Sequence, residues 1–261
     1  MAKQKFRAPR RSGCSRVKAY TLYVEVLNKR CNAGGRTFCL AITYSIERIT
    51  MTQCDTKTRI LDGAEQLFAR EGFHNTSLRA ITSLAEVNLA SVNYHFGSKD
   101  ALLQAVIERR LLPLNQIRGD KIKEVLDRSR KEKTQPTAAA LLEAFIEPTL
   151  EFRNSSQRAR DFISLIGRSL SEPDETIRNC FLTLVLPIFQ ELFAGLREAL
   201  PQLPPAILLT RLQFIMGTMS HVMCMGTLSA FNNPALPPPL DQGSLIDQLL
   251  KYALAGLEAP E

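Results

Sequence analysis

Residues 90–99 read ASVNYHFGSK and place hydrogen-bonding side chains at three consecutive positions, Asn93, Tyr94 and His95. Amphipathic helical sequence lies on both sides, yet the stretch lacks the charges that usually cover a solvated helix face. An Asn side chain can bind the edge of adenine through two hydrogen bonds, and a Tyr hydroxyl can reach a phosphate oxygen. Two interpretations are open: these side chains either cap a core or contact another molecule.

The residues before this stretch predict two helices. In the first, apolar residues recur on one face and Gly72 provides a natural end: Ile60, Leu61, Ala64, Leu67 and Phe68. In the second, Thr76 or Ser77 is the expected N-cap, and four apolar residues share a face: Leu78, Ile81, Leu84 and Ala85. Only the tripeptide of residues 86–88 separates this helix from the next, so the turn between them is tight.

The stretch itself predicts a two-turn helix over residues 89–96, with Asn88 as its N-cap and Gly97 at its end. Ser98 is expected to cap a fourth helix, which reaches about residue 112 and has a flexible end at Pro113. Five apolar residues of this helix face inward: Leu102, Leu103, Val106, Ile107 and Leu111. Helix, tight turn and short helix make a helix-turn-helix, in which the second helix of the pair lies in the major groove of DNA.

Under this interpretation the third helix divides its residues between core and groove. Val92 and Phe96, four residues apart, hold it to the core. The free N–H groups at the start of the next helix, with Lys99, form a phosphate site. The alternative is a purely structural three-helix bundle. Residues 51–99 hold five basic and five acidic side chains, so net charge does not favour DNA binding.

Residues 57–103 resemble the DNA-binding domain of the TetR/AcrR family of bacterial transcriptional regulators. The likeness is carried by LFAREGF, by TSLRAI, and by HFGSK with the ALL that follows it. It implies two sets of DNA-binding candidates, to which we add the capping Asn88. Phosphate contacts come from Thr76, Ser77, Tyr94 or His95, and Lys99; base contacts come from Leu89, Ala90, Ser91 and Asn93.

Two positions depart from the family pattern. Glu86 stands in the turn where Gly is frequent, and Asn93 stands where Tyr is frequent. The base preference of a relative therefore cannot be transferred to this chain. The segment VNLASVNYHFGSK also resembles a subgroup that contains a fatty-acid-responsive repressor.

Charge and cysteine usage limit the class of protein. Of the 33 Lys/Arg and 26 Asp/Glu residues, 11 and 2 lie in residues 1–50, which leaves 22 and 24 for the remainder. The net charge of +7 therefore belongs to the N-terminal segment. The six cysteines include no CxxC pair and no His at ligand spacing, so we predict no metal site, no disulfide framework and no cofactor. A reducing, cytoplasmic compartment fits this usage.

Residues 1–50 differ in composition from the rest of the chain: they are Arg-rich and lack a persistent apolar stripe. The apolar run of residues 39–46 is too short to span a membrane and too far from the terminus for an ordinary signal peptide. We expect a basic extension that is disordered, or that is not translated if Met51 is the true start. The rival interpretation is a basic arm that adds phosphate contacts to DNA.

Beyond residue 114 the sequence predicts further helices and no catalytic constellation. Helices are expected over residues 140–152, 159–170 and 175–200, with Pro148 and Pro187 as kinks or boundaries. The chain has only three histidines, and paired carboxylates or a Ser-His-Asp set are absent from the sequence pattern. This argues against an enzyme.

Residues 205–231 predict another apolar helix. Residues 212–231 contain no Asp, Glu, Lys or Arg and are long enough to span a bilayer, but their polar side chains favour a buried helix at a dimer interface. Four of the six methionines lie here, and Met packs adaptably around ligands. The candidate effector-pocket residues are Met216, Met219, His221 and Met223. For His221, a satisfied core histidine is the main interpretation and a ligand contact the alternative.

After the Pro-rich loop of residues 232–243, Ser244 and Asp247 resemble a capping box, and a broad apolar stripe follows: Leu245, Ile246, Leu249, Leu250, Ala253, Leu254 and Leu257. Two late apolar helices suit the two-fold interface of a homodimer, which the resemblance also implies. The sequence therefore predicts an all-α protein. It comprises an N-terminal three-helix helix-turn-helix domain (residues 51–99) and a C-terminal helical bundle for ligand binding and dimerisation (residues 100–261).

The predicted function is ligand-controlled repression. A homodimer places two recognition helices about 34 Å apart on a palindromic operator of double-stranded DNA. A small apolar effector enters the bundle, shifts the fourth helix and releases the DNA by differential affinity. Two alternatives remain open: a helical apolar-ligand binding protein or enzyme with a vestigial helix-turn-helix head, and a membrane-associated protein that uses residues 212–231. Specific DNA binding and detergent-free solubility discriminate between them.

Overall fold

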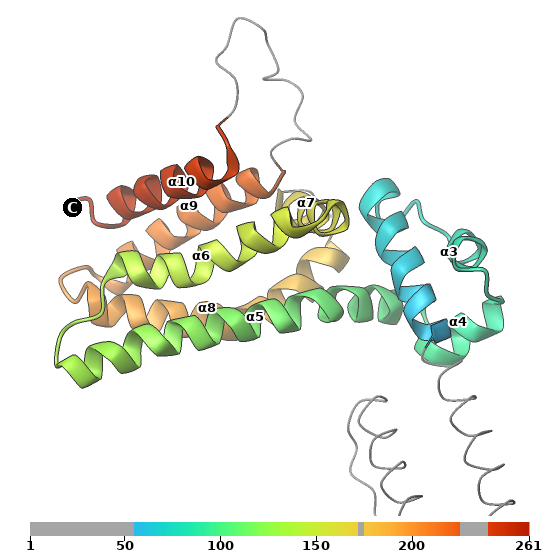
Figure 1. Cartoon of the computed structure of the whole chain (residues 1–261), viewed down its shortest axis with the longest axis horizontal. Helices are drawn as coiled ribbons and strands as arrows, with labels where there is room; N and C mark the ends of the chain where they lie inside the picture. Colours follow the sequence, from blue (N-terminus) through green and yellow to red (C-terminus); the bar gives the residue numbers. More distant parts are fainter. Residues whose placement is uncertain (1–54, 172–174, 225–239, 261) are drawn as a thin grey trace, which may run out of the picture.

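A computed structural model describes residues 55–171, 175–224 and 240–260. These residues form helices and connecting turns, with no strand in the described ranges, which confirms the expected all-α class. The extension predicted for residues 1–50 lies outside the described residues. A small head lies at one end of an elongated helical bundle (Figure 1). The head consists of the helix of residues 55–71, α3 (Leu78–Ala85) and α4 (Leu89–Phe96).

Capping side chains and glycines set the ends of the head helices, as predicted. Ser77 caps α3, and its hydroxyl oxygen accepts a first-turn backbone N–H at 3.0 Å. Asn88 caps α4, and its side-chain oxygen Oδ1 accepts a first-turn N–H at 2.7 Å. Gly72 and Gly97 follow helices with φ values of +81° and +78°, a conformation that glycine adopts without steric cost. Local sequence signals therefore decide where these helices start and stop.

The faces that the head helices bury are mainly those expected. Val92 of α4 is buried, with Phe96 half-buried beside it, and α3 buries Ile81 and Ala85. Leu84 is a correction, because 45% of it is exposed. The two-turn α3 centres its buried face on residues 81, 82 and 85, and Leu84 points away from that centre.

The long helix α5 (Lys99–Glu132) runs from the head along the bundle (Figure 1). Ser98 caps it as predicted, and the expected inward residues of its first turns are buried. The expected end near residue 112 is wrong, because Pro113 lies inside a continuous 34-residue helix. A helical proline removes one backbone hydrogen bond, and the buried Leu111 and Leu114 beside it compensate by packing. An unbroken helix therefore joins head and bundle.

The rest of the bundle is formed by α6 (Ala138–Ser155), α7 (Gln157–Ser171), α8 (Glu175–Ala199), α9 (Pro205–Cys224) and α10 (Gln242–Leu257). α5 packs against α6 and α8, α7 packs against α6 and α9, and α10 packs against α6 and α9 (Figure 1). Pro148 and Pro187 lie inside α6 and α8, so neither proline ends its helix. The buried side chains of head and bundle form one continuous apolar core.

The last helix begins earlier than predicted. Asp241, not Ser244, is the N-cap of α10, and its carboxylate accepts the backbone N–H of Ser244 at 3.1 Å. Hydrogen bonds from Ser244 lower the pKa of the Asp241 carboxyl. The expected stripe is buried at Leu249, Ala253 and Leu257 and half-buried elsewhere. The segment after Cys224 that was expected to continue α9 lies outside the described residues.

Two helices, α8 and α9, are long and apolar enough to cross a membrane by length and composition alone. Their most apolar windows are only 33% and 44% buried in the single chain. Exposed apolar side chains account for this: Leu182, Leu186, Ile207, Leu209 and Phe214. The same surface would suit contact with a second protein molecule, so hydropathy by itself does not decide between the two environments.

Candidate nucleic-acid interface and bundle cavity

The outer face of α4 exposes side chains that could touch another molecule. Leu89 and Tyr94 are 41% and 74% exposed, and Ala90 and Asn93 are exposed between them. These positions share one side of the two-turn helix, opposite the buried Val92. A short helix that is held by one buried residue and presents Leu, Asn and Tyr outward matches the residue types that read bases in a major groove.

The polar candidates at the helix starts have partners within the head. The Asn88 side-chain oxygen accepts from the backbone N–H and the hydroxyl of Ser91, at 2.7 and 2.9 Å. Ser77 is exposed and caps α3. Thr76 is a correction to the expected phosphate contacts, because it is 1% exposed and its hydroxyl donates to the Gly72 carbonyl oxygen at 2.8 Å. Its side chain stabilises the turn and does not reach a phosphate in this conformation.

Two lysines flank α4. The Lys99 ammonium lies 4.4 Å from the centre of the Phe73 ring and 3.4 Å from the His74 carbonyl oxygen. The Lys57 ammonium lies 5.8 Å from the centre of the Phe96 ring, at the C-terminal end of α4. Lys57 was not among the predicted contacts, because nothing in the local pattern indicates that residues 57 and 96 meet. Partial burial and the charge of Lys57 lower the pKa of His95, which favours its neutral form.

The turn between α3 and α4 contains a residue with a left-handed backbone conformation. Glu86 has φ 51° and ψ 47°, the left-handed conformation that costs other residues about 1–2 kcal/mol. Arg59 holds the turn by donating to the carbonyl oxygen of Glu86 at 3.1 Å and to its carboxylate at 3.2 Å. These two hydrogen bonds connect the turn to the helix of residues 55–71.

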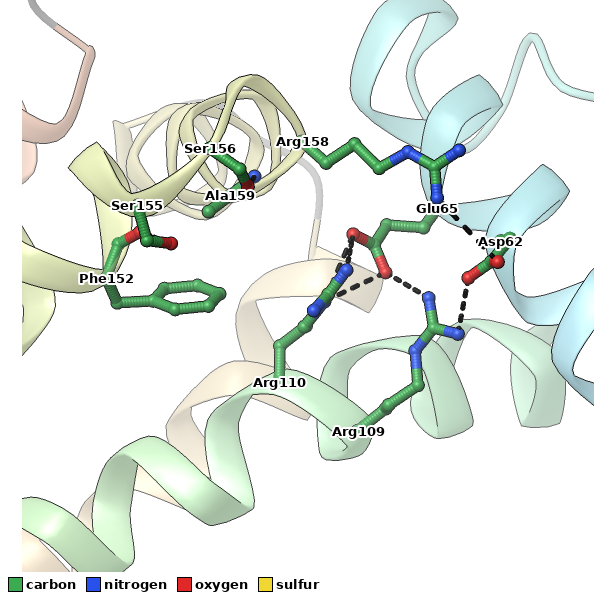
Figure 2. A network of polar contacts seen from close by, with 9 residues as sticks. All are labelled: Asp62, Glu65, Arg109, Arg110, Phe152, Ser155, Ser156, Arg158 and Ala159. Atoms are coloured by element: carbon green, nitrogen blue, oxygen red, sulfur yellow. Dashed lines mark hydrogen bonds and ion pairs between the residues drawn. The ribbon is translucent and has the colours of Figure 1, made fainter.

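A cluster of charged side chains joins the head to the bundle (Figure 2). Glu65 lies in the helix of residues 55–71, and only 5% of its side chain is exposed. Its carboxylate accepts hydrogen bonds from Arg109 and Arg110 of α5, the latter at 2.8 Å. Arg109 also pairs with Asp62 at 2.7 Å, and Arg158 of α7 approaches Asp62 at 3.7 Å. We call these five residues the junction cluster. It fixes the head to both α5 and α7.

The bundle contains a small inner cavity and a larger groove. The cavity, of about 10 Å³, lies among apolar side chains from α5, α6, α7, α8 and α9, with Arg118 in its wall. The groove, of about 710 Å³, runs between α8 and α9 and opens to solvent. Phe181, Val185 and Met216 line both spaces. These three side chains therefore separate the groove from the inner cavity.

The predicted pocket residues divide into two groups. Met216, Met219 and Met223 line the inner cavity together. His221 lines neither space and is exposed, so its expected place in the core is wrong. The sequence predicted that α9 is buried nearly all round, but one side of this helix is exposed to solvent in the single chain. Arg118 was not predicted as a pocket residue, since a single Arg within the charged sequence of α5 carries no signal of burial.

α9 and α10 each have a solvent-exposed face in the single chain. Phe214 is 68% exposed, with Gly217 and His221 exposed on the same side of α9. On α10, Tyr252 is 66% exposed and Gly256 lies one turn further along. The two helices pack against each other. Each helix thus exposes one aromatic side chain and one glycine on its outer surface. Over the described residues, no group of three or more potential metal ligands is found.

Two family models match this chain. Residues 60–106 match the model for bacterial regulatory proteins of the tetR family. Residues 143–256 match the model for the tetracyclin repressor-like C-terminal domain. The two matches cover most of the helix-turn-helix head and most of the bundle from α6 to α10.

Two relatives match over a short part of this chain. The chain is 42% identical over 52 residues to the HTH-type transcriptional regulator UidR of Escherichia coli. This match covers 20% of this chain and 26% of UidR. The chain is also 36% identical over 61 residues to the HTH-type transcriptional repressor NicS of Pseudomonas putida. This second match covers 23% of this chain and 29% of NicS. The chain thus matches little more than a quarter of the length of these relatives.

The likeness in fold extends over most of the chain. The transcriptional regulator FadR from Bacillus subtilis, solved in complex with stearoyl-CoA, superposes with a TM-score of 0.57 at 16% identity. The superposition covers 76% of this chain and 98% of FadR. At this level of identity the comparison concerns the fold.

Proposed function

Because the chain belongs to the TetR family of bacterial regulatory proteins, we propose that it is a homodimeric transcriptional repressor that a small effector releases from a palindromic operator. The observation that carries the proposal is the outer face of α4. This face exposes Leu89, Asn93 and Tyr94 on a helix-turn-helix whose other side is buried. Residues 51–99 form the DNA-binding domain, and residues 100–261 form the domain for effector binding and dimerisation. Such a regulator acts in the cytoplasm.

In the proposed complex, α4 lies in the major groove. Leu89 contacts a thymine methyl group, Ala90 and Ser91 allow close approach, and Asn93 reads a base edge. The phosphate contacts come from Ser77, Tyr94, His95 and Lys99, helped by the backbone N–H groups at the start of α5. Asn88 positions the first turn of α4 through Ser91 rather than through DNA. Lys57 adds a positive charge at the far end of α4.

The dimer is proposed to form through the outer surface of α9 and α10. Exposed Phe214 and Tyr252 provide apolar area, and Gly217 and Gly256 have open space where a Cβ would lie, which lets helices of a partner approach closely. A two-fold axis would give two copies of α4, matching the two half-sites of a palindrome.

Effector control is proposed to act through α5. This helix begins at the head, carries the arginines of the junction cluster and lines the inner cavity with Leu111, Leu114 and Arg118. An effector that binds better when α5 is displaced would shift the spacing of the two heads and lower operator affinity. Because α5 is unbroken and the junction cluster links the head to it, a movement of α5 would move the head as well.

The test is a gel shift of the full chain with the DNA upstream of its own gene, and with random DNA as competitor, at several salt concentrations. Asn93→Ala should lower affinity for the operator while leaving affinity for random DNA unchanged. Lys99→Ala should weaken binding to both and reduce the salt slope by about 0.9 per lost phosphate contact. Lys131→Ala, which changes an exposed lysine in the last turn of α5, at the opposite end of that helix from the head, is the matched control and should change neither.

Two outcomes would contradict the proposal. If the full chain shows no preference for any upstream fragment over random DNA, it is not a regulator of that region. If Asn93→Ala and Lys99→Ala lower affinity for operator and random DNA equally, their separate roles in base reading and phosphate contact are wrong.

A further inference from the structure

Arg118 places a positive charge in the centre of the bundle. The residue is 3% exposed. Its Nε donates to the Phe145 carbonyl oxygen at 3.1 Å, its Nη1 to Oδ1 of Asn115 at 2.9 Å, and its Nη2 to the hydroxyl oxygen of Thr149. The guanidinium also lies 4.4 Å from the centre of the Phe145 ring. All of these partners are neutral.

A buried guanidinium without a counter-ion is costly. No carboxylate among the described residues pairs with Arg118, and burial lowers its pKa to about 9, which leaves it charged at neutral pH. An arginine has five N–H donors. In the part of the chain that the structure describes, three have acceptors, and the remaining two lie one on each terminal nitrogen. An apolar side chain of similar volume would be expected to stabilise the bundle more.

The position of this charge points to a ligand. Arg118 and Thr149 lie in the wall of the inner cavity, whose other walls are apolar. At about 10 Å³ the cavity has room for little more than one water molecule. The groove of about 710 Å³ begins behind Phe181, Val185 and Met216. Met216 is unbranched and can change rotamer at low cost, so this wall can open.

We propose that Arg118 binds the carboxylate of an amphiphilic organic acid, whose apolar body lies in the groove between α8 and α9. The two remaining N–H groups, one on each terminal nitrogen, suit a carboxylate with two oxygens. The apolar body would lie against Leu182, Leu186 and Phe189 of the groove. This inference rests on the proposed function, because it names the chemical class of the effector.

Binding at this site would act directly on the helix that carries the head. Arg118 follows the junction-cluster residue Arg109 by nine positions on α5, about 14 Å along the helix axis. An acid that takes the two remaining N–H groups would draw the guanidinium toward the groove and away from Phe145 and Thr149, the neutral partners that now join α5 to α6. Loss of these bonds would let α5 move relative to α6 and carry the head with it.

The experiment compares acids with uncharged analogues of the same chain length. Hexanoate, decanoate and palmitate, each with the corresponding alcohol, are titrated into the full chain by calorimetry at neutral pH. At least one acid should bind about tenfold or more tightly than its alcohol, since a hydrogen bond to a charged group contributes more than a neutral one. Arg118→Met should bind the acid and its alcohol with equal affinity.

Two further variants keep the test decisive. Lys121→Met removes a charge one turn further along α5, where Lys121 pairs with Glu147 near the surface, and it should leave the preference for the acid unchanged. Thr149→Val removes a neutral acceptor of Arg118 and should strengthen the preference for the acid, which tests the site even if Arg118→Met fails to fold.

The inference is overturned if no acid binds, if acids and alcohols bind the wild type equally, or if folded Arg118→Met still prefers the acid. A gel shift in the same series separates this from the proposed function. Wild type that binds its operator but shows no preference for acids rejects only the ligand class. Wild type that prefers acids through Arg118 but binds no operator rejects the regulator and leaves the acid site in place.

Discussion

The substitution Glu65→Gln tests the junction cluster. Glu65 accepts hydrogen bonds from two neighbouring arginines of α5, and 5% of its side chain is exposed. Glutamine keeps the shape and one acceptor oxygen but removes the negative charge. Arg109 and Arg110 would then lie side by side at the junction without their shared counter-ion. We expect a less stable protein with a less firmly held head.

The size of the loss follows from burial. Removing one partner of a fully buried ion pair costs about 3–5 kcal/mol. The Arg109 and Arg110 side chains are 24% and 30% exposed, so water screens part of the unpaired charge, and Asp62 still pairs with Arg109. We therefore expect a loss of about 2–3 kcal/mol in the free energy of unfolding. For a chain of this size this corresponds to a fall in Tm of about 4–12 °C.

The assay is urea and thermal unfolding followed by circular dichroism at one fixed protein concentration, because the proposed dimerisation would make stability depend on concentration. Glu124→Gln is the control. It breaks an exposed pair with Arg128 on α5, at 2.7 Å, and should cost less than about 0.5 kcal/mol. Operator affinity, measured where both variants are folded, should fall only for Glu65→Gln. Losses of similar size for the two variants would refute the reasoning.

Three further predictions concern the backbone and one titrating group. Glu86→Gly relieves the left-handed conformation at the turn and should raise the free energy of unfolding by about 0.5–1 kcal/mol; a urea midpoint at or below that of the wild type would speak against strain there. Gly167→Ala places a Cβ 2.7 Å from Sγ of Cys224, so α7 and α9 must separate, and a loss of about 1–3 kcal/mol is expected; an unchanged Tm would show that they adjust freely. Partial burial and Lys57 hold the pKa of His95 below 6.5, so the unfolded chain takes up this proton first. The contribution of His95 to the free energy of unfolding is therefore complete above pH 6.5 and is lost as the pH falls through its folded pKa. His95→Gln should flatten this part of the curve of stability against pH. An unchanged slope in the variant would show that another group causes it.

Several features follow from the sequence by itself. The caps at Ser77, Asn88 and Ser98 and the helix ends at Gly72 and Gly97 are decided within one turn of chain, so local chemistry is sufficient to predict them. The spacing of apolar residues likewise predicts which side of each head helix is buried, with Leu84 of α3 as the exception. For the same reason the helix-turn-helix and the outer face of α4 could be predicted, since both depend on a short, contiguous segment.

Tertiary structure decides what local patterns leave open. Pro113 would end an isolated helix, but packing of Leu111 and Leu114 carries α5 through it. The same apolar pattern on α9 leaves Phe214 and His221 outside, because α7 and α10 cover only part of that helix.

The charged sites depend on contacts between distant parts of the chain. Glu65 meets Arg109 across 44 positions, and Arg118 reaches the carbonyl oxygen of Phe145 across 27. In the sequence these residues look like ordinary charges on solvated helix faces, since nothing near them specifies a partner. Both the cost of burying a charge and the partners that offset this cost come from other elements of the fold. Whether a charge is buried, paired or left for a ligand therefore depends on which helices the fold brings together.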